Sequence, residues 1–237
     1  NFYLNLAKYL NPNFISFEVL YAENFFVINE YNEAKKIYQE IQKHGSIYSW
    51  YASKQIASIL IEQEEKITAV SFLKKTFQKI TNPTIYETFD YAEFLKNNEK
   101  YKESIKYYSK IINIVDKNHD LYGQMLDGRG IAYERTDQWN KAEIDLLNSL
   151  SASPNDAYVI NYLAYTWIEK GINIDKSLNM LKKANTLRPN DGYITDSLGW
   201  ALFKVKNYKE AKKYLQQAVT LMASDPVIND HYADSLW

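Results

Sequence analysis

The chain of 237 residues is 46% apolar and 24% charged, a composition that suits a packed core and argues against disorder. Its formal net charge is −1 and only three of its 28 basic residues are arginine, which argues against a general nucleic-acid binder. The absence of cysteine excludes disulfides, cysteine-based metal sites and thiol nucleophiles. No apolar run is long enough to span a bilayer, so we expect no membrane insertion by this segment.

The spacing of the prolines predicts a structural repeat. Proline cannot occupy a helix interior, so regularly spaced prolines mark regular helix breaks. The five prolines are separated by about one or two multiples of 35 residues; they are Pro12, Pro83, Pro154, Pro189 and Pro226. A small residue recurs with the same period, at Ala22, Ala57, Ala92, Gly130, Ala164 and Gly199.

These signals order the expected elements along the chain. Residues 1–14 fit the second helix of a partial repeat, and residues 226–237 fit the first helix of another. Between them we expect six full units, the third of which carries extra residues near Asn118–Tyr122. The units span residues 15–49, 50–84, 85–122, 123–156, 157–191 and 192–225.

Within the units the apolar spacing is helical. Leu198, Leu202 and Val205 share one helix face, and no segment has a strand pattern. The segments Pro154-Asn155-Asp156 and Pro189-Asn190-Asp191 are expected to supply helix breaks and capping side chains for the helices that follow. The sequence therefore predicts an all-α chain of about 14 helices in antiparallel pairs, forming a single array from residue 1 to 237.

Two runs of residues match a known repeat. The first is Leu198-Gly199 with Leu202, Tyr208, Ala211, Leu215 and Ala218, and the second is Gly130 with Tyr133, Trp139, Ala142, Leu146 and Pro154. Over essentially its whole length the chain resembles the tetratricopeptide repeat (TPR), whose unit has about 34 residues. The resemblance implies a right-handed α-solenoid, or superhelix, that binds other proteins without catalysis or cofactors. Pentatricopeptide repeats fit the charge balance less well, and armadillo and HEAT units are longer.

In the resembled family, the first helix of each pair lines a concave groove. Tyrosine and tryptophan give a large contact area for little lost entropy, and neighbouring aspartates favour a cationic group or peptide amides. The alternative is that these aromatics only pack against neighbouring units. Carried over to the C-terminal half, the groove positions are Tyr158, Asn161, Tyr165, Tyr193, Asp196, Trp200, Phe203, Asp230 and Asp234.

One binding mode of that family is not expected here. Chaperone-binding members hold a terminal carboxylate with basic and asparagine side chains at set groove positions. Lys54 has a suitable charge, but Ser58 replaces the asparagine, and Glu93 and Asp127 would repel a carboxylate.

No catalytic or metal site is expected. The histidines His44, His119 and His231 have no partner at metal-ligand spacing, and we expect each at the surface or at a helix end. Gly128 and Gly130 are followed by no lysine, so they do not form a phosphate loop.

Residues 156–237 have a narrower resemblance. The segments Asn161–Trp167, Asp196–Leu202, Asp225–His231 and Asp234–Trp237 are similar to bacterial cell-envelope TPR lipoproteins that act as adaptors for periplasmic proteases. This implies a periplasmic or outer-membrane-associated adaptor, with a cytoplasmic location as the alternative. Because the terminal half-units lack polar caps and the chain begins at Asn1, we expect the natural protein to continue in both directions.

The predicted function is a non-catalytic scaffold or adaptor that binds a protein or peptide partner and no nucleic acid. A repeat region appended to an enzyme is one alternative. The other is an architectural module for self-association.

Overall fold

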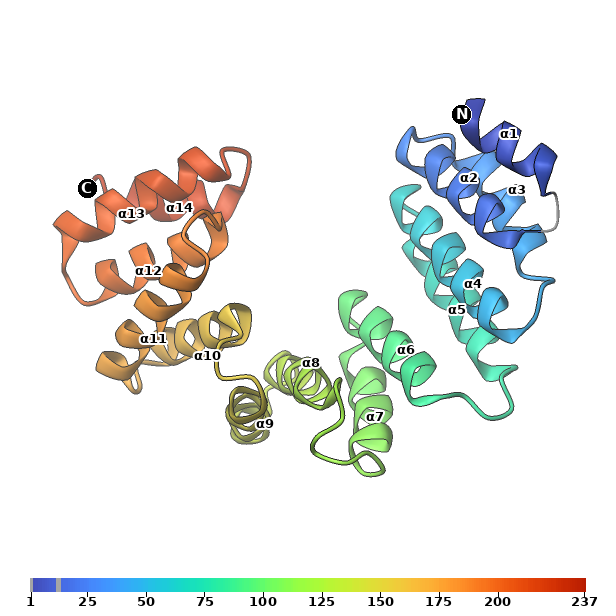
Figure 1. Ribbon diagram of the computed structural model, residues 1–237. Coiled ribbons are helices and arrows are strands. Elements are labelled where there is room, and N and C mark those ends of the chain that lie inside the picture. Colours follow the sequence, from blue (N-terminus) through green and yellow to red (C-terminus); the bar gives the residue numbers. More distant parts are fainter. Residues whose placement is uncertain (1, 12–13) are drawn as a thin grey trace. The chain divides into compact units, whose positions relative to one another are not determined.

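The fold is all-α. The computed structural model describes residues 2–11 and 14–237, and within them it has fourteen helices and no strand (Figure 1). Consecutive helices pair and stack as in an α-solenoid, which confirms the predicted fold class and number of helices.

The chain divides into two compact units. Unit 1 spans residues 1–107 and unit 2 spans residues 108–237, so the division falls within α7 (Tyr101–Ile112). Before α7, unit 1 contains α1 (Phe2–Leu10), α2 (Ile15–Val27), α3 (Tyr31–Ile41), α4 (Ser46–Glu62), α5 (Lys66–Gln78) and α6 (Ile85–Asn97).

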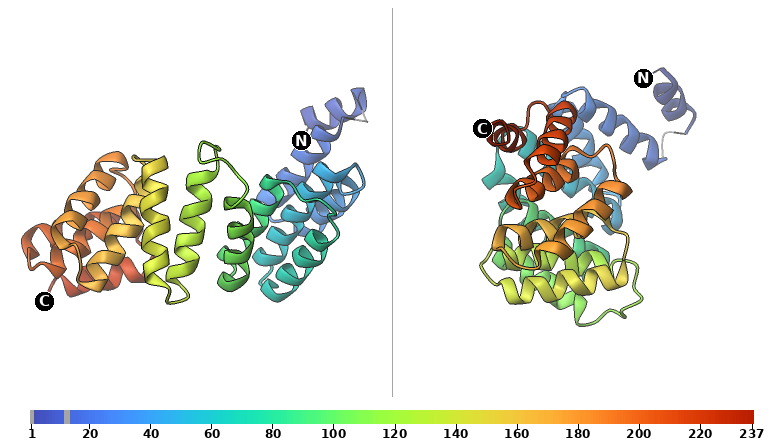
Figure 2. Two further views of the ribbon diagram at one scale, coloured as in Figure 1. Left: turned by 90° about the horizontal axis from the view of Figure 1, so that it is seen from below. Right: turned by 90° about the vertical axis from the view of Figure 1, so that its left-hand side faces the viewer.

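Unit 2 continues with seven further helices (Figure 2). They are α8 (Tyr122–Glu134), α9 (Trp139–Ala152), α10 (Ala157–Lys170), α11 (Ile174–Leu187), α12 (Gly192–Lys204), α13 (Tyr208–Leu221) and α14 (Pro226–Asp234). The connection from α7 to α8, residues 113–121, is longer than the neighbouring connections and holds the extra residues that the sequence predicted there.

Small residues lie where paired helices approach each other. A Cβ atom built on Gly199 of α12 would lie 2.7 Å from Leu215 Cγ of α13, closer than carbon atoms can approach, so only glycine fits. Alanines at equivalent positions in other pairs have no solvent exposure; they are Ala22, Ala57, Ala92 and Ala164 in first helices and Ala34, Ala69, Ala142 and Ala211 in second helices.

The turns inside the pairs repeat the period in the backbone. About every 35 residues one residue adopts a left-handed conformation, with φ between 59° and 68°, shortly before a second helix begins. These residues are Asn29, Glu64, Glu99, Asp137, Gly171 and Lys206. The recurrence gives a backbone basis for a 35-residue unit, while the exact limits of the six units stay a prediction.

Three helices of unit 2 begin with an aspartate cap. Asp156 accepts hydrogen bonds from the amides of Tyr158 and Val159, and Asp191 accepts one from Ile194. Both predicted caps are confirmed. Asp225 caps α14 in the same way. An aspartate N-cap therefore starts each of α10, α12 and α14, and these three helices present equivalent faces.

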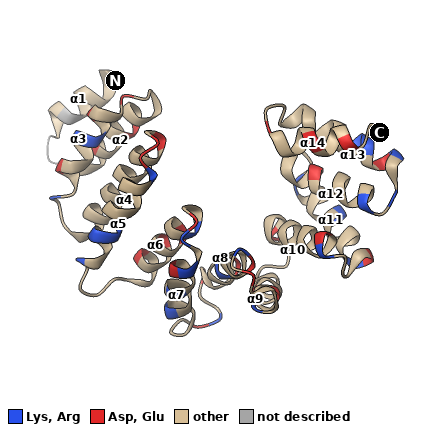
Figure 3. Cartoon of the chain, turned by 180° about the vertical axis from the view of Figure 1, so that it is seen from behind, with Lys and Arg blue, Asp and Glu red and all other residues tan. Residues whose placement is uncertain are grey.

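Aromatic donors bonded to carboxylates join neighbouring helices within each unit. Tyr51 of α4 donates to Glu23 of α2 at 2.5 Å, and Tyr162 of α10 donates to Glu134 of α8 at 2.8 Å. These bonds satisfy the polar end of a largely apolar side chain and explain part of the high tyrosine content. Both signs of charge occur on the helices of each unit (Figure 3).

Candidate functional site

Three helices of unit 2 present equivalent positions side by side. Asn161 of α10, Asp196 of α12 and His231 of α14 are each separated by 35 residues, and α12 packs against both α10 and α14. Repetition of the helix pair therefore places these three side chains on one face of the three first helices.

Asp196 and His231 form a buried pair. His231 Nδ1 lies 2.8 Å from Asp196 Oδ2, and the two side chains are 10% and 8% exposed, respectively. Because a carboxylate only accepts hydrogen bonds, Nδ1 must carry the proton of this contact. The second carboxylate oxygen, Asp196 Oδ1, is buried and has no hydrogen-bond partner among the described residues.

Trp200 is packed between side chains. Its ring is nearly parallel to the His231 ring at a centroid distance of 4.0 Å and to the Phe203 ring at 5.2 Å. Its Nε1 donates to Glu169 Oε1 of α10 at 2.8 Å. Lys204 lies over the same indole at 5.4 Å and 3.5 Å from the Glu169 carboxylate. Trp200 therefore links α10, α12 and α14 through stacking and one hydrogen bond.

Tyr165 and Asn161 lie on α10 beside this cluster, and both are half-buried. Burial, and next the negative charges of Glu169 and Asp196, raise the pKa of Tyr165 to about 12. Asn161 Oδ1 is buried and, like Asp196 Oδ1, accepts no hydrogen bond from any described residue.

The remaining predicted groove residues are more open. Tyr158 and Tyr193 occupy the same place in the first turns of α10 and α12, and each is 54% exposed. The Tyr158 hydroxyl donates to Asp191 Oδ2 at 3.0 Å. Asp230 and Asp234 are exposed on α14. The structure thus brings Asp196 and Trp200 against His231, and Phe203 stacks on Trp200. The binding role of all nine residues stays a prediction.

Two members of the cluster were missed from sequence. His231 was expected at the surface or at a helix end. It does lie in the last turn of α14, but the structure buries it against Asp196 and Trp200. Glu169 was not considered. The constant 35-residue spacing from Asn161 through Asp196 to His231 was the signal that could have identified the histidine.

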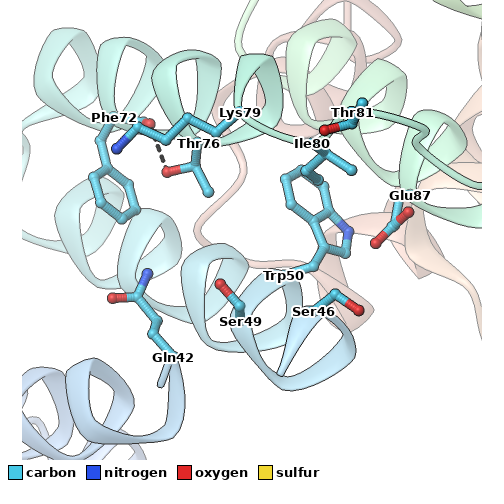
Figure 4. Close-up of a pocket in the computed structure, with 10 residues that line it drawn as sticks. All are labelled: Gln42, Ser46, Ser49, Trp50, Phe72, Thr76, Lys79, Ile80, Thr81 and Glu87. Carbon is cyan, nitrogen blue, oxygen red and sulfur yellow. Dashed lines mark hydrogen bonds between the residues drawn. The ribbon is translucent and has the colours of Figure 1, made fainter. Parts of the chain in front are cut away.

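Unit 1 has a weaker candidate. A pocket of about 560 Å³ lies among α3, α4, α5 and α6, and Figure 4 shows Trp50 and Ile80 at its wall. Its acidic residue, Glu87, is engaged in the capping box of Thr84. Lys54, examined as a carboxylate ligand, is paired with Asp90 at 2.6 Å.

Two kinds of site are missing from the part of the chain that the structure describes. None of its helices combines the length and the apolar character that crossing a membrane requires. No three histidine, aspartate or glutamate side chains in it are grouped closely enough to hold a metal ion.

One helix pair of unit 2, α12 with α13, matches a known protein family. The family model of the tetratricopeptide repeat matches residues 197–224, which cover most of α12 and all of α13. Residues 197–224 are therefore a tetratricopeptide repeat, and the chain has the fold of tetratricopeptide-repeat proteins. Gly199, Ala211 and Ala218, the small residues of this pair, lie inside the matched segment and are buried.

A relative of the chain also carries this repeat. The TPR repeat-containing protein PA4667 of Pseudomonas aeruginosa is 27% identical over 135 residues, which are 54% of this chain and 21% of PA4667. The chain thus spans about a fifth of that relative.

Solved structures match the fold. The APC/C hetero-tetramer Cut9-Hcn1 matches with a TM-score of 0.74 and 12% identity, over 99% of this chain and 45% of that one. A tetratricopeptide repeat protein from Parabacteroides merdae matches with a TM-score of 0.59 and 15% identity, over 79% of this chain and 72% of that one.

Proposed function

We propose that this protein is a non-catalytic scaffold that binds a protein or an extended peptide across α10, α12 and α14, on the concave side of the array. The observation that supports this most directly is the repetition of polar and aromatic side chains at equivalent positions of three contacting helices. An extended peptide can run across successive first helices and meet a similar set of groups on each.

The composition of this surface suits recognition. Tyr158 and Tyr193 are large, stiff and half-exposed, so they can bury much area on a partner at little entropic cost. Asp230 adds an exposed acceptor on α14. The packed cluster around Trp200 links the three helices that carry these open side chains.

We extend the proposal to an adaptor role in bacterial envelope assembly or protease regulation. It is supported by the sequence resemblance of residues 156–237 and by the match to a protein of Pseudomonas aeruginosa. Since the chain spans about a fifth of that relative, a repeat region attached to an enzyme is the second candidate. Self-association is the third, and light scattering over a concentration range tests it.

The experiment is affinity capture from lysate of the source organism with three folded proteins. The first is the wild type. The second is the variant Tyr193→Ala/Asp230→Lys, which changes two exposed side chains of the proposed surface. The control is Ile144→Ala/Asp175→Lys, which makes similar changes at exposed positions of α9 and α11. Circular dichroism verifies that all three have equal helicity.

A protein that is retained by the wild type and the control, but lost by the Tyr193/Asp230 variant, would support the proposal. Retention by all three would place the interface elsewhere. Capture of nothing by the wild type would favour the attached or self-associating module.

A further inference from the structure

Two oxygen atoms in unit 2 lack the hydrogen bonds that buried oxygens normally have. Asn161 Oδ1 and Asp196 Oδ1 are buried without a partner among the described residues, and they occupy equivalent positions on the adjacent helices α10 and α12. An unmade hydrogen bond in a protein interior costs about 1–3 kcal/mol, more for a charged group, so such atoms call for an explanation. The hydroxyls of Tyr38 and Tyr91 are also buried without a partner among the described residues, and they belong to core tyrosines of unit 1.

Two carboxylates, those of Asp196 and Glu169, bring negative charge to this part of unit 2. Asp196 uses one oxygen for His231 and keeps the other unpaired, although its side chain is only 8% exposed. Burial first, and next the charges of Glu169 and Asp196, raise the pKa of Tyr165, so both carboxylates act on this residue. Lys204 is directed to Glu169, with about 40% of its side chain exposed. The negative electrostatic potential of these carboxylates therefore favours an additional positive charge nearby.

Both oxygens are closed to solvent in this structure, so a ligand reaches them only when a covering side chain moves. Tyr165 is half-buried on α10, and movement of its ring is the opening that the inference requires. Asn161 is also half-buried and faces the surface with part of its side chain. By contrast, Trp200 and His231 are fixed by stacking and hydrogen bonds and form a rigid wall.

We propose that Asn161 and Asp196 form a receptor for a positively charged side chain, arginine or lysine, carried by an extended segment of a partner protein. The proposal rests on the proposed function and specifies the chemistry of the same surface. A guanidinium presents several N–H donors in one plane and can bridge acceptors on two helices, and an ammonium offers three donors. Hydrogen bonds to a carboxylate from a charged donor are about twice as strong as neutral ones. A cationic group therefore satisfies this pair better than a main-chain amide does.

The test uses three short peptides of identical length. They are acetyl-Gly-Ser-Ala-X-Ala-Ser-Gly-amide with arginine, lysine or citrulline at X. Citrulline has nearly the shape of arginine but no charge. Binding is followed by NMR through the Trp200 indole N–H signal, which a Trp200→Phe variant assigns. We expect the arginine and lysine peptides to bind at least about tenfold more tightly than the citrulline peptide.

Variants locate the binding. Asn161→Leu removes an acceptor that makes no hydrogen bond in the protein, so it should leave folding intact and weaken the two charged peptides. Asp196→Asn should weaken them further. The control Asp175→Asn removes the same charge from an exposed position on α11 and should leave binding unchanged.

Several results would overturn the inference. Equal binding of the arginine and citrulline peptides would show that charge is not recognised. Equal weakening by Asp175→Asn and Asp196→Asn would reduce the effect to general charge, and absence of binding by all three peptides would remove the receptor. If capture in the previous experiment still depends on Tyr193 and Asp230, the proposed function stands while this inference fails.

Discussion

His231 Nδ1 lies 2.8 Å from Asp196 Oδ2, and this contact joins α14 to α12 at equivalent positions of two successive helix pairs. The imidazole also stacks on Trp200, so a single side chain provides both a hydrogen bond and an aromatic contact. The attachment of the last helix to unit 2 therefore depends strongly on His231.

We predict that His231→Ala destabilises unit 2 by about 2–4 kcal/mol, because it leaves the Asp196 carboxylate buried without a partner and removes the ring that covers Trp200. Urea unfolding measures the loss, and hydrogen exchange should show α14 opening first. The variant Asp196→Ala/His231→Ala should lose less than the sum of the two single variants. Additive losses would show that the two side chains are not coupled.

Gly199→Ala should cost about 1–3 kcal/mol through overpacking, since the new Cβ would lie 2.7 Å from Leu215 Cγ and 3.0 Å from the Leu215 backbone nitrogen. The backbone nitrogen cannot move without shifting α13. Gly130→Ala is the matched comparison and should cost less, because its closest contact, Leu146 Cγ, is at 3.0 Å. Thermal unfolding of both variants tests this, and an unchanged midpoint for Gly199→Ala would contradict it.

Much of the fold followed from the sequence because its signals are local and repeated. Gly199 and the alanines mark the close approach of paired helices, and Asp156 and Asp191 mark helix starts. The side-chain arrangement of the candidate site was harder to predict from the sequence. Charged and imidazole side chains are usually exposed, so the burial of Asp196 with His231 runs against the prior expectation. The pairing depends on the rotamers of residues on different helices, which spacing alone does not specify.

Trp200 illustrates the same limit. Its position on a first helix predicted an aromatic on the groove side, but not that the indole would be held by Glu169 and by two stacked rings. An aromatic residue that packs against its own helices and one that contacts a partner occur in the same sequence pattern. Only the contacts with neighbouring side chains distinguish the two. For this reason the more exposed Tyr193 is the better position for testing partner capture.

Lys206→Gly should stabilise unit 2 by about 1 kcal/mol. Lys206 has φ of 65° in the turn between α12 and α13, a conformation in which an L residue is strained and glycine is not. Gly171, in the equivalent turn between α10 and α11, already uses the favourable residue. Lys206→Ala keeps the strain and is the control. Equal unfolding midpoints for the glycine and alanine variants would argue against backbone strain at this turn.

Alkaline pH should destabilise the protein between about pH 10 and 12 because of its buried tyrosines. Burial, followed by the Glu23 charge for Tyr38 and by the Glu169 and Asp196 charges for Tyr165, raises the pKa of both hydroxyls from 10.0 to about 12. The folded state then retains protons that the unfolded state releases. The stabilisation is complete below pH 10 and is lost as the pH rises through 12. Tyr165→Phe should flatten the decline, as measured by urea unfolding across this range; an unchanged slope would contradict the assignment.

Arg129→Met should be the most damaging of these substitutions, at about 3–5 kcal/mol, because it leaves a buried carboxylate unpaired. Arg129 of α8 donates from Nε and Nη2 to the two oxygens of Asp145 of α9, at 2.6 and 2.9 Å, and from Nη1 to Ser109 Oγ at 3.1 Å. The Asp145 side chain is only 6% exposed. Replacing both charges, as in Arg129→Met/Asp145→Leu, should recover most of the stability, since an apolar pair of similar volume needs no desolvation of ions. Urea unfolding of the single and double variants distinguishes the two cases. If the double variant is as unstable as the single one, the side chains around α8 and α9 require the hydrogen bonds of this pair and not merely its neutrality.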